Sequence, residues 1–344
     1  MSTKKLGNQT FAFSTPPSII GYGNAVGKKE GDGPLSSYFD YICPDDCFNE
    51  KSWEKAESAM QKKAITNAMK LANASAASID YIFAGDLLNQ CIATAYAVRS
   101  QNIPFFGLYG ACSTMAESLA LASMMLDGKF GKKAIAMTSS HFCSAERQYR
   151  NPLEYGGQRT PTAQWTATGS GAVVLSEHGS GPYVTHATVG KIIDKGISDV
   201  NNMGAAMAPA AYSTLSAHFE DTGRTPNDYD LIVTGDLGAL GKEIVIDFFS
   251  KDGINLGANY TDCGVLLYDL EKQDVHAGGS GCGCSAVVLT GYLLKEMIQG
   301  KWNSILFCGT GALHSPTSIM QGESIPGICH AVSICNKKGA AQNG

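Results

Sequence analysis

The sequence predicts an α/β protein made of two pseudo-symmetric halves, and two observations lead to this prediction. Apolar, strand-like runs alternate with helical patterns along the 344 residues, which is typical of a sheet covered by helices on both faces. Two kinds of segment also occur twice, and this indicates an internal duplication. We expect the halves to span residues 1–180 and 181–336, followed by a flexible tail at 337–344.

The first repeated segment is a strand that ends in Gly-Asp. "IDYIFAGDLLNQ", which starts at Ile79, resembles "YDLIVTGDLGAL", which starts at Tyr229. The alignment matches Gly85-Asp86 with Gly235-Asp236, and a helical pattern precedes each copy. We therefore expect a helix followed by a buried strand in both halves.

The second repeated segment consists of a loop, a helix with few charges and a strand. A shift of 172 residues places Cys112-Ser113 on Cys284-Ser285, and Gly128-Lys129 on Gly300-Lys301. The strands "KAIAMT" and "ILFCGT" then also coincide. Helices with so few charges are buried nearly all round, so we expect the two to pack together. Their N-termini, Cys112 and Cys284, should face a shared cleft.

The ends of these helices carry familiar signals. Thr114 and Glu117 have the spacing of a capping box at a helix start. Gly128 and Gly300 stand where a left-handed residue would end each helix.

Composition excludes several classes of function. The net charge of −5 provides no basic face, so nucleic-acid binding is not expected. No apolar run reaches the roughly 18 residues of a membrane-spanning helix, and the N-terminus lacks the apolar core of a signal peptide. We therefore expect a cytoplasmic protein.

The eleven cysteines are scattered and odd in number, so we expect them to be mostly reduced and buried. The pair in "CPDDC" (Cys43 and Cys47) could ligate a metal. No second pair has matching spacing, so a polar loop is the favoured interpretation. We expect no metal site and no cofactor.

The duplicated chain with "GACS" at the start of a buried helix resembles the thiolase and ketoacyl-synthase superfamily. "WTATGSGAVVLSE" and "HAGGSGCGCSAVV" resemble its glycine-rich segments, and the resemblance covers roughly residues 10 to 335. It implies a five-layered α-β-α-β-α architecture and a homodimer formed through the sheet edge of the first half. It also places Cys112 at the position of the cysteine that becomes acylated in that superfamily.

A narrower resemblance concerns "HFCSAERQYRNPLEYGGQRTPTAQWTATGSGA" and "GTGALHSPTS". These segments are similar to the stage V sporulation protein AD (SpoVAD) family. The resemblance implies binding of dipicolinic acid (pyridine-2,6-dicarboxylate), alone or with calcium. It also implies uptake of this acid into the developing spore with membrane-embedded SpoVA partners, and a peripheral location at the spore inner membrane.

Condensing enzymes of the superfamily need two histidines besides the cysteine. The matching places hold Asp236 and the stretch Gly278–Gly281, which includes Ser280. A carboxylate near Cys112 would raise the pKa of the thiol and oppose its use as a nucleophile. We therefore predict a non-catalytic binding protein on an enzyme scaffold. The alternatives are an active condensing enzyme or acyltransferase that uses Cys112, and a purely architectural subunit.

Dipicolinate is flat and carries two carboxylates, so its site needs donors at both ends and apolar walls between them. Helix N-termini at Cys112 and Cys284 supply N–H groups, and arginines bind carboxylates bidentately. We favour Arg159, which lies closest in sequence to the glycine-rich strand, over Lys242. Arg147, Arg150, Tyr149 and Tyr155 are candidates because one loop is dense in Arg and Tyr; the alternative for any one arginine is an ordinary charged surface loop. The other candidates are His314, which follows a predicted strand end, and Asp236 and Ser280, at the histidine positions of the superfamily. His141 and His276 are weaker candidates.

Overall fold

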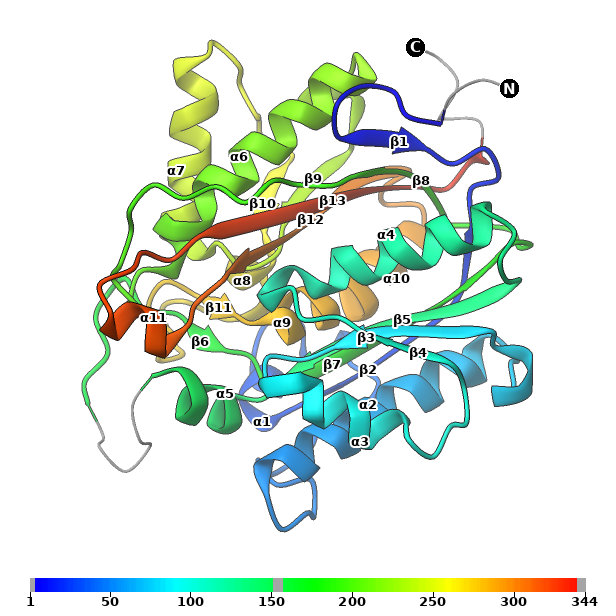
Figure 1. The fold of residues 1–344 in the computed structure, drawn as a ribbon, viewed down its shortest axis with the longest axis horizontal. Coiled ribbons are helices and arrows are strands. Elements are labelled where there is room, and N and C mark those ends of the chain that lie inside the picture. The colour runs from blue at the N-terminus through cyan, green and yellow to red at the C-terminus, as the bar shows by residue number, and fades with distance from the viewer. Residues whose placement is uncertain (1–3, 151–156, 339–344) are drawn as a thin grey trace.

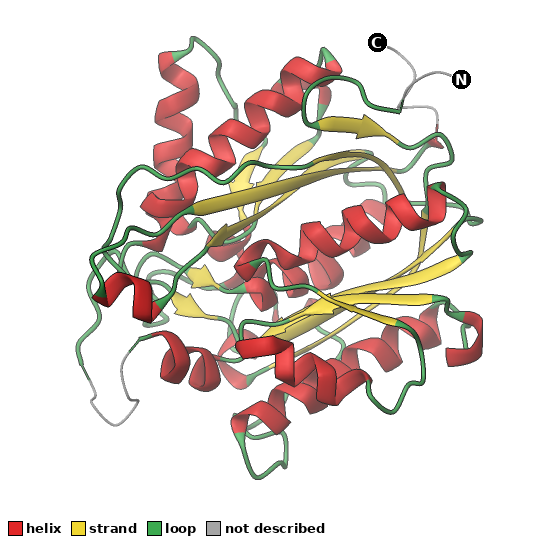
Figure 2. Cartoon of the chain, viewed as in Figure 1, coloured by secondary structure: helices red, strands yellow, loops and turns green. Residues whose placement is uncertain are grey.

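The computed structural model describes residues 4–150 and 157–338. Five layers follow one another from top to bottom in Figure 1: helices, a sheet, central helices, a second sheet and a last layer of helices. This arrangement confirms the predicted α/β fold with two similar halves. The secondary structure is drawn in Figure 2, where both sheets run beside the central helices.

The two sheet layers are joined at one edge into a continuous 11-stranded sheet, to which each half contributes five strands besides β1. The first half supplies β2 (Ser18–Val26), β3 (Tyr81–Gly85), β4 (Phe105–Gly107), β5 (Lys133–Ser140) and β7 (Gly169–Ser176). The second half supplies β8 (Tyr183–Thr188), β9 (Leu231–Thr234), β10 (Tyr260–Asp262), β12 (Ser304–Ala312) and β13 (Gly327–Cys335).

The strand order confirms the duplication. It reads β2-β7-β5-β3-β4 in one half and β8-β13-β12-β9-β10 in the other, and β1 (Thr10–Ala12) pairs with β8. In each half the last three strands are parallel and the first two antiparallel. The halves meet where Ser18 of β2 pairs with Tyr183 of β8. The expected boundary at residue 180 falls in the loop between β7 and β8.

The outer helices match between the halves as well. In the first half α2 (Trp53–Leu71) packs on β2 and β7, and in the second α6 (Met203–Thr222) packs on β12 and β13. The helices α3 (Ile92–Val98) and α7 (Gly238–Lys251) lie beside them. Close approach of α2 requires a glycine on β2, since a Cβ at Gly21 would lie 2.3 Å from the carbonyl oxygen of Ala68.

The central layer holds the two helices of the second repeat. The first is α4 (Thr114–Asp127). The second runs through α9 (Cys282–Val287), a π-helical turn (Val288–Leu293) and α10 (Leu294–Ile298). They pack against each other and against the sheet, and this confirms the predicted contact between the central helices.

The predicted helix signals are only partly right. The capping box at Thr114 is wrong, because a 3₁₀ turn (Ala111–Ser113) leads directly into α4 and leaves Ser113 in helical conformation, whereas a capping residue needs extended backbone. Gly300 has the predicted left-handed conformation at φ +85°, but Gly128 has φ −75° and Lys129 takes that role at φ +64°.

Short elements gather at one end of the layers, on the left in Figure 1. They are α1 (Lys28–Gly31), α5 (Phe142–Tyr149), β6 (Trp165–Thr166), α8 (Cys263–Leu267), β11 (Gly279–Ser280) and α11 (Pro316–Met320). β6 and β11 form a separate two-stranded parallel sheet. Across the two described ranges, no helix has the length and apolar character that crossing a membrane requires.

Candidate functional site

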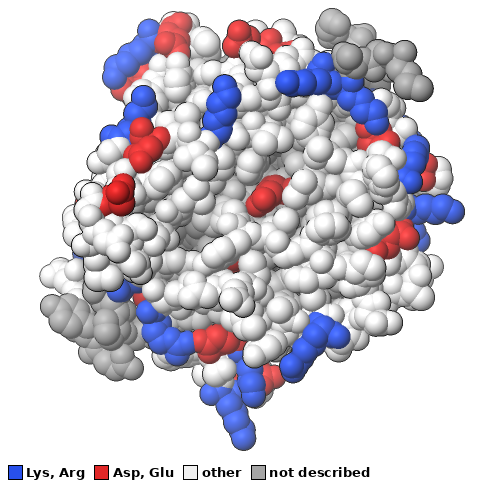
Figure 3. Space-filling model, viewed as in Figure 1, with Lys and Arg blue, Asp and Glu red and all other residues white. Residues whose placement is uncertain are grey.

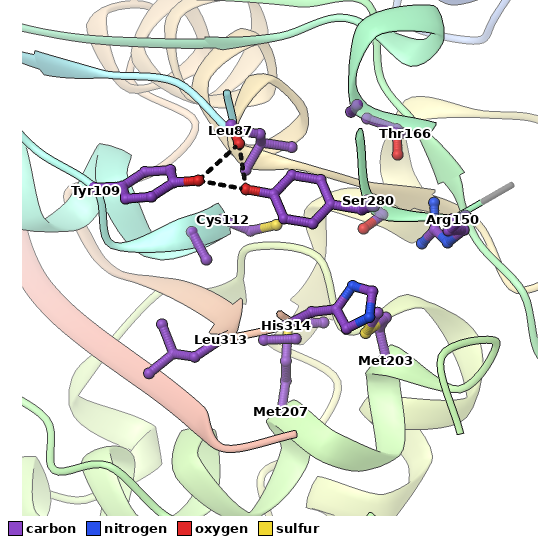
Figure 4. A pocket seen from close by; sticks show the side chains of 14 residues that line it. Leu87, Tyr109, Cys112, Arg150, Thr166, Met203, Met207, Ser280, Leu313 and His314 are labelled. Carbon is purple, nitrogen blue, oxygen red and sulfur yellow. Dashed lines mark hydrogen bonds between the residues drawn. The ribbon is translucent and has the colours of Figure 1, made fainter. Parts of the chain in front are cut away.

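A pocket of about 240 Å³ lies between the halves. Its lining comes from the loops after β3 and β4, the helices α5 and α6, the small sheet β6–β11, and the end of β12. The lining residues are Leu87, Tyr109, Ala111, Cys112, Ala145, Tyr149, Arg150, Thr166, Met203, Met207, Ser280, Ala312, Leu313 and His314. Figure 4 shows that these side chains converge from both halves on one space.

Tyr149 is the aromatic wall of this pocket. Its hydroxyl lies 2.7 Å from the hydroxyl of Tyr109 and also donates to the carbonyl oxygen of Leu87. Its ring lies 5.8 Å from the ring of His314, between centroids. Cys112 and Tyr149 pack against the same buried cluster of Leu87, Ala145 and Cys282, and Figure 4 draws the hydrogen bonds at Tyr109 and Leu87.

Behind the lining of the pocket, the Cys112 side chain meets Asp236, which is not itself a lining residue. This carboxylate is fully buried and accepts hydrogen bonds from the Cys112 thiol and from Thr310 Oγ1, the latter at 2.7 Å. Burial, together with the charge of Asp236, raises the pKa of the Cys112 thiol well above its usual range. The thiol is therefore protonated at neutral pH, whereas nucleophilic chemistry requires the thiolate.

Asp236 also occupies the N-terminus of α9. The N–H of Gly281 donates to its Oδ2 at 2.9 Å, and Ser280 Oγ lies 3.3 Å from the same atom. Gly281 has φ +93°, a conformation that favours glycine. The positive end of this helix is thus directed at a carboxylate of the protein itself. Of the two predicted residues, Ser280 lines the pocket, whereas Asp236 is buried outside the lining.

The expectation that Cys284 faces the shared cleft is wrong. The helix begins at Cys282, so Cys284 lies within the first turns and is buried in the core with Cys263 and Tyr268. The sequence alignment matched the two Cys-Ser pairs, and it did not show that the second helix begins two residues before Cys284. Only Cys112 of the two cysteines lines the pocket.

The three predicted arginines divide between the pocket and the surface. Arg150 lines the pocket, and its guanidinium pairs with Glu146, one helical turn earlier. Arg147 instead pairs with Glu54 and lies over the ring of Trp53. It is absent from the lining of the pocket because it follows a different face of α5.

Arg159, the favoured arginine, is also outside the pocket. Its Nη2 donates to the carbonyl oxygen of Asp274 at 2.8 Å, and its guanidinium lies 4.7 Å from the ring centre of Trp165. Successive residues of a strand point to opposite faces; Thr166 lines the pocket, so Trp165 and the arginine on it belong to the other face. There Trp165 also stacks on Phe142, with 3.7 Å between ring centroids.

The other weak candidates have structural partners. Lys242 lies 3.9 Å from Glu243, His276 pairs with Asp274, and none of these lines the pocket. Tyr155 and the tail beyond residue 338 lie outside the described residues.

His314 is the histidine of the pocket, as predicted. Its Nδ1 is buried and has no hydrogen-bond partner. Burial and the neighbouring charge of Arg150 lower its pKa to about 4, so the ring is neutral at pH 7 and one nitrogen can donate to a ligand. His141 has a different role: it caps α5 and lies outside the pocket lining.

Several lining residues were missed from the sequence. Met203 and Met207 lie one turn apart on α6, and Tyr109 precedes the "GACS" turn. The methionine spacing was the available signal, but it is equally typical of core packing. Within the described ranges, no group of three His, Cys, Asp or Glu side chains is arranged to hold a metal ion.

A second buried carboxyl, that of Glu57, forms a hydrogen bond with α5. Glu57 of α2 accepts from Ser139 of β5 at 2.8 Å and from Ser144 of α5 at 3.0 Å. Burial, with the nearby charge of Asp86, raises the pKa of Glu57 to about 8. Glu57 therefore joins the outer helix, the sheet and the helix that carries Tyr149 into the pocket.

Comparison with known proteins gives one family and one fold. The profile of the stage V sporulation protein AD (SpoVAD) family matches residues 7–335. Stage V sporulation protein AD of Bacillus subtilis (strain 168) is 48% identical over 338 residues, which cover 98% of this chain and 100% of that protein.

Solved structures share the fold at low identity. One is 3-oxoacyl-[acyl-carrier-protein] synthase III from Aquifex aeolicus VF5, with a TM-score of 0.58 and 14% identity over 93% of this chain and 99% of that one. Another is cerulenin-bound OleA of Xanthomonas campestris, with a TM-score of 0.61 and 14% identity over 97% and 100% of the two chains. The predicted thiolase-like, five-layered fold is confirmed.

The pKa of Glu57 predicts a specific pH dependence of stability. The unfolded chain ionises Glu57 near its ordinary pKa of 4.5, while the folded chain keeps it protonated up to about pH 8. Between these values the folded state binds the extra proton, so this group lowers the free energy of unfolding as pH rises, by at most about 1.4 kcal/mol per pH unit. Glu57→Gln should remove that slope.

Urea unfolding at several pH values between 5 and 8, roughly spanning this window, measures the effect. Wild type should lose stability relative to Glu57→Gln as pH rises. Glu54→Gln, on the same helix but outside the buried network, is the matched control and should run parallel to wild type. Parallel curves for Glu57→Gln and wild type would contradict the assignment.

Proposed function

The chain belongs to the stage V sporulation protein AD (SpoVAD) family of bacterial sporulation, and on this premise we propose that it is a non-catalytic protein that binds dipicolinic acid in the pocket between its halves. The observation that carries the proposal is the pairing of the Cys112 thiol with the buried carboxylate of Asp236. This pair disfavours the nucleophile of a condensing enzyme, and the pocket beside it contains the unpaired Nδ1 of His314.

The pocket's chemistry fits a flat aromatic dianion. Apolar walls come from Leu87, Met203 and Met207, and Tyr149 presents an aromatic ring. A single substituted pyridine ring is compatible with a volume of about 240 Å³. Burial of the ring against these walls supplies affinity, and the polar groups around it set orientation.

Two side chains supply the donors in the proposed complex. Arg150 binds one carboxylate, because a guanidinium matches the two oxygens of that group; its present partner, Glu146, gives way or shares the guanidinium. His314 donates from the nitrogen that has no partner to the ring nitrogen or the second carboxylate. Leaving this buried nitrogen unpaired is unfavourable, so a ligand acceptor gains free energy there.

Catalysis has little support in this site. The family position of one histidine holds Asp236, which accepts hydrogen bonds and does not donate them while ionised. The other position holds Ser280, whose hydroxyl is directed to the same carboxylate. An oxyanion hole needs donors directed at the reacting oxygen, but Ser280 donates to Asp236 instead. Burial raises the pKa of the Asp236 carboxyl, and the hydrogen bonds that it accepts oppose this rise.

The proposed role extends to transport and assembly. The chain passes dipicolinate, alone or with calcium, to membrane-embedded SpoVA partners and works at the periphery of the spore inner membrane. This part rests on the family, whereas ligand binding is the step that the pocket supports. No nucleic acid and no cofactor enter this role.

A homodimer through the first-half sheet edge is also proposed. β4 is the outermost strand of that half, and Phe106 on it is 49% exposed. Tyr109, which follows β4 in sequence, and Met124, which lies on α4, are exposed as well. In Figure 3, Lys and Arg side chains lie around the rim of this face, and its centre is mostly uncharged. An exposed apolar edge of this kind is typical of an interface.

Affinity for dipicolinate should depend on Arg150. Arg150→Ala removes the proposed partner of a carboxylate in a partly dry pocket and should weaken binding by about 2 to 4 kcal/mol, or roughly thirty- to several-hundred-fold. Cys112→Ala should cost about 1 kcal/mol or less. Titration calorimetry of folded variants measures these constants.

Arg159→Ala is the matched control for this series, since Arg159 lies outside the pocket, and it should bind within about twofold of wild type. Arg150→Ala with wild-type affinity would overturn the site assignment. Wild-type protein that shows no binding up to millimolar dipicolinate would remove the proposed function and favour an architectural subunit.

Incubation with acyl-CoA separates binding from catalysis. Because the pKa of the Cys112 thiol is raised, we expect no stoichiometric acyl adduct in the intact mass at neutral pH. An adduct of one acyl group per chain that disappears in Cys112→Ala would favour the condensing enzyme instead.

The dimer proposal predicts that Phe106→Arg yields monomers. A buried, unpaired guanidinium at a two-fold interface is strongly unfavourable, and light scattering after size exclusion measures the mass. Met320→Arg, at an 81% exposed position on α11, should leave the dimer intact. A wild-type monomer at micromolar concentration would refute the interface.

A further inference from the structure

The "CPDDC" loop and the first turn of α5 bring together two of the few accessible cysteines. Of the eleven cysteines, Cys47 is exposed, Cys112 and Cys143 are half-buried, and the other eight are buried. Cys112 belongs to the pocket already described. The pair Cys47 and Cys143 has no part in that site and was not explained by the sequence.

One imidazole connects the two cysteine segments. His141 Nε2 lies 2.7 Å from the carbonyl oxygen of Asp46, the residue before Cys47. The opposite ring nitrogen, Nδ1, accepts from the backbone N–H of Cys143 at 3.2 Å. The His141 ring therefore bridges the backbone of the loop and the backbone of α5.

The two thiols are also electrostatic neighbours. After burial, the charges of Asp46 and Cys47 are the next causes that raise the pKa of Cys143, which reaches about 11. Interactions of this kind act over short distances. Cys47 is therefore close enough to Cys143 for its charge to act on the Cys143 thiol.

The loop that carries Cys47 is exposed from Pro44 to Cys47, and the next residue, Phe48, is buried. The two residues after Cys47 are left-handed, with φ +49° at Phe48 and +59° at Asn49. Left-handed backbone is unfavourable for a bulky residue such as phenylalanine. A disulfide needs Cα atoms within about 7 Å, so forming the bond requires the exposed part of the loop to carry Cys47 toward α5.

We propose that Cys47 and Cys143 form a reversible disulfide that locks the "CPDDC" loop onto the first turn of α5. The oxidant is a low-molecular-weight disulfide such as oxidised glutathione. The exposed Cys47 thiolate attacks one of its sulfur atoms and releases one thiol. Cys143 then attacks the Cys47 sulfur of the mixed disulfide and releases the second thiol, so the chain loses two hydrogen atoms and the oxidant gains them.

The position of the bond gives it a route to the pocket. α5 begins one residue before Cys143 and ends at Tyr149, and Arg150 follows as its C-cap. The disulfide would tie the start of this helix to α2's preceding loop, while its end carries two pocket residues. The disulfide would thus couple the redox state of the two cysteines to α5, the helix that forms part of the pocket wall.

The test uses the full-length protein treated with oxidised glutathione, quenched with N-ethylmaleimide under denaturing conditions and weighed intact. We expect two fewer maleimide adducts than the eleven of the reduced chain, no retained glutathione, and a Cys47–Cys143 linked peptide after digestion. The thermal midpoint should rise by roughly 5 °C or more, because the bond closes a long loop.

Variants make each result decisive. Cys143→Ser should lose the cross-link and retain one glutathione on Cys47, whereas Cys47→Ser should lose the cross-link and retain none, because burial raises the pKa of Cys143. Cys112→Ser should form the cross-link as wild type does. Glutathione retained on both cysteines of the wild type, a cross-link to another cysteine, or eleven free thiols after treatment would each overturn the proposal. None of these readouts depends on dipicolinate binding.

Discussion

The buried carboxylate of Asp236 is the interaction on which the centre of the molecule depends. It lies where β9 has ended, accepts from Thr310 of β12 and from Gly281 at the start of α9, and meets the Cys112 thiol at the start of the other central helix. Four elements from both halves therefore converge on one charge. A buried carboxylate is stable only when such donors surround it, and the same group raises the pKa of the Cys112 thiol.

The duplicated architecture could be predicted from the sequence because its signals lie within short repeated segments. The Gly-Asp strand ends and the Gly-Lys helix ends recur at fixed spacing, so element order and the contact between central helices followed. Details within one turn did not follow. The alignment treated Cys112 and Cys284 as equivalent, but the second helix begins at Cys282 and contains a π-helical turn, so Cys284 is in the core. Nothing in residue spacing reports where a helix takes its first turn.

The candidate site was predicted in outline, and its failures also have physical causes. Cys112, Arg150, Ser280 and His314 line the pocket, whereas Asp236 is buried outside its lining; their part in ligand binding stays a prediction. Arg159 was favoured for its closeness in sequence to the glycine-rich strand. Closeness along a strand does not fix which face a side chain joins, and here an aromatic ring and the backbone of Asp274 hold this arginine on the face opposite Thr166. Tyr109 and the α6 methionines come from segments without a motif.

The stack of Trp165 on Phe142 has a practical meaning beyond packing. Trp165 is one of three tryptophans in the chain, its ring lies parallel to that of Phe142 within 7°, and the Nζ of Lys29 lies 3.7 Å from its ring centre. Indole emission responds to nearby cations and to stacking partners. Phe142 is the first residue of α5, so the protein contains an optical reporter on the helix that borders its pocket, and movements of that helix can be followed in solution without any added label.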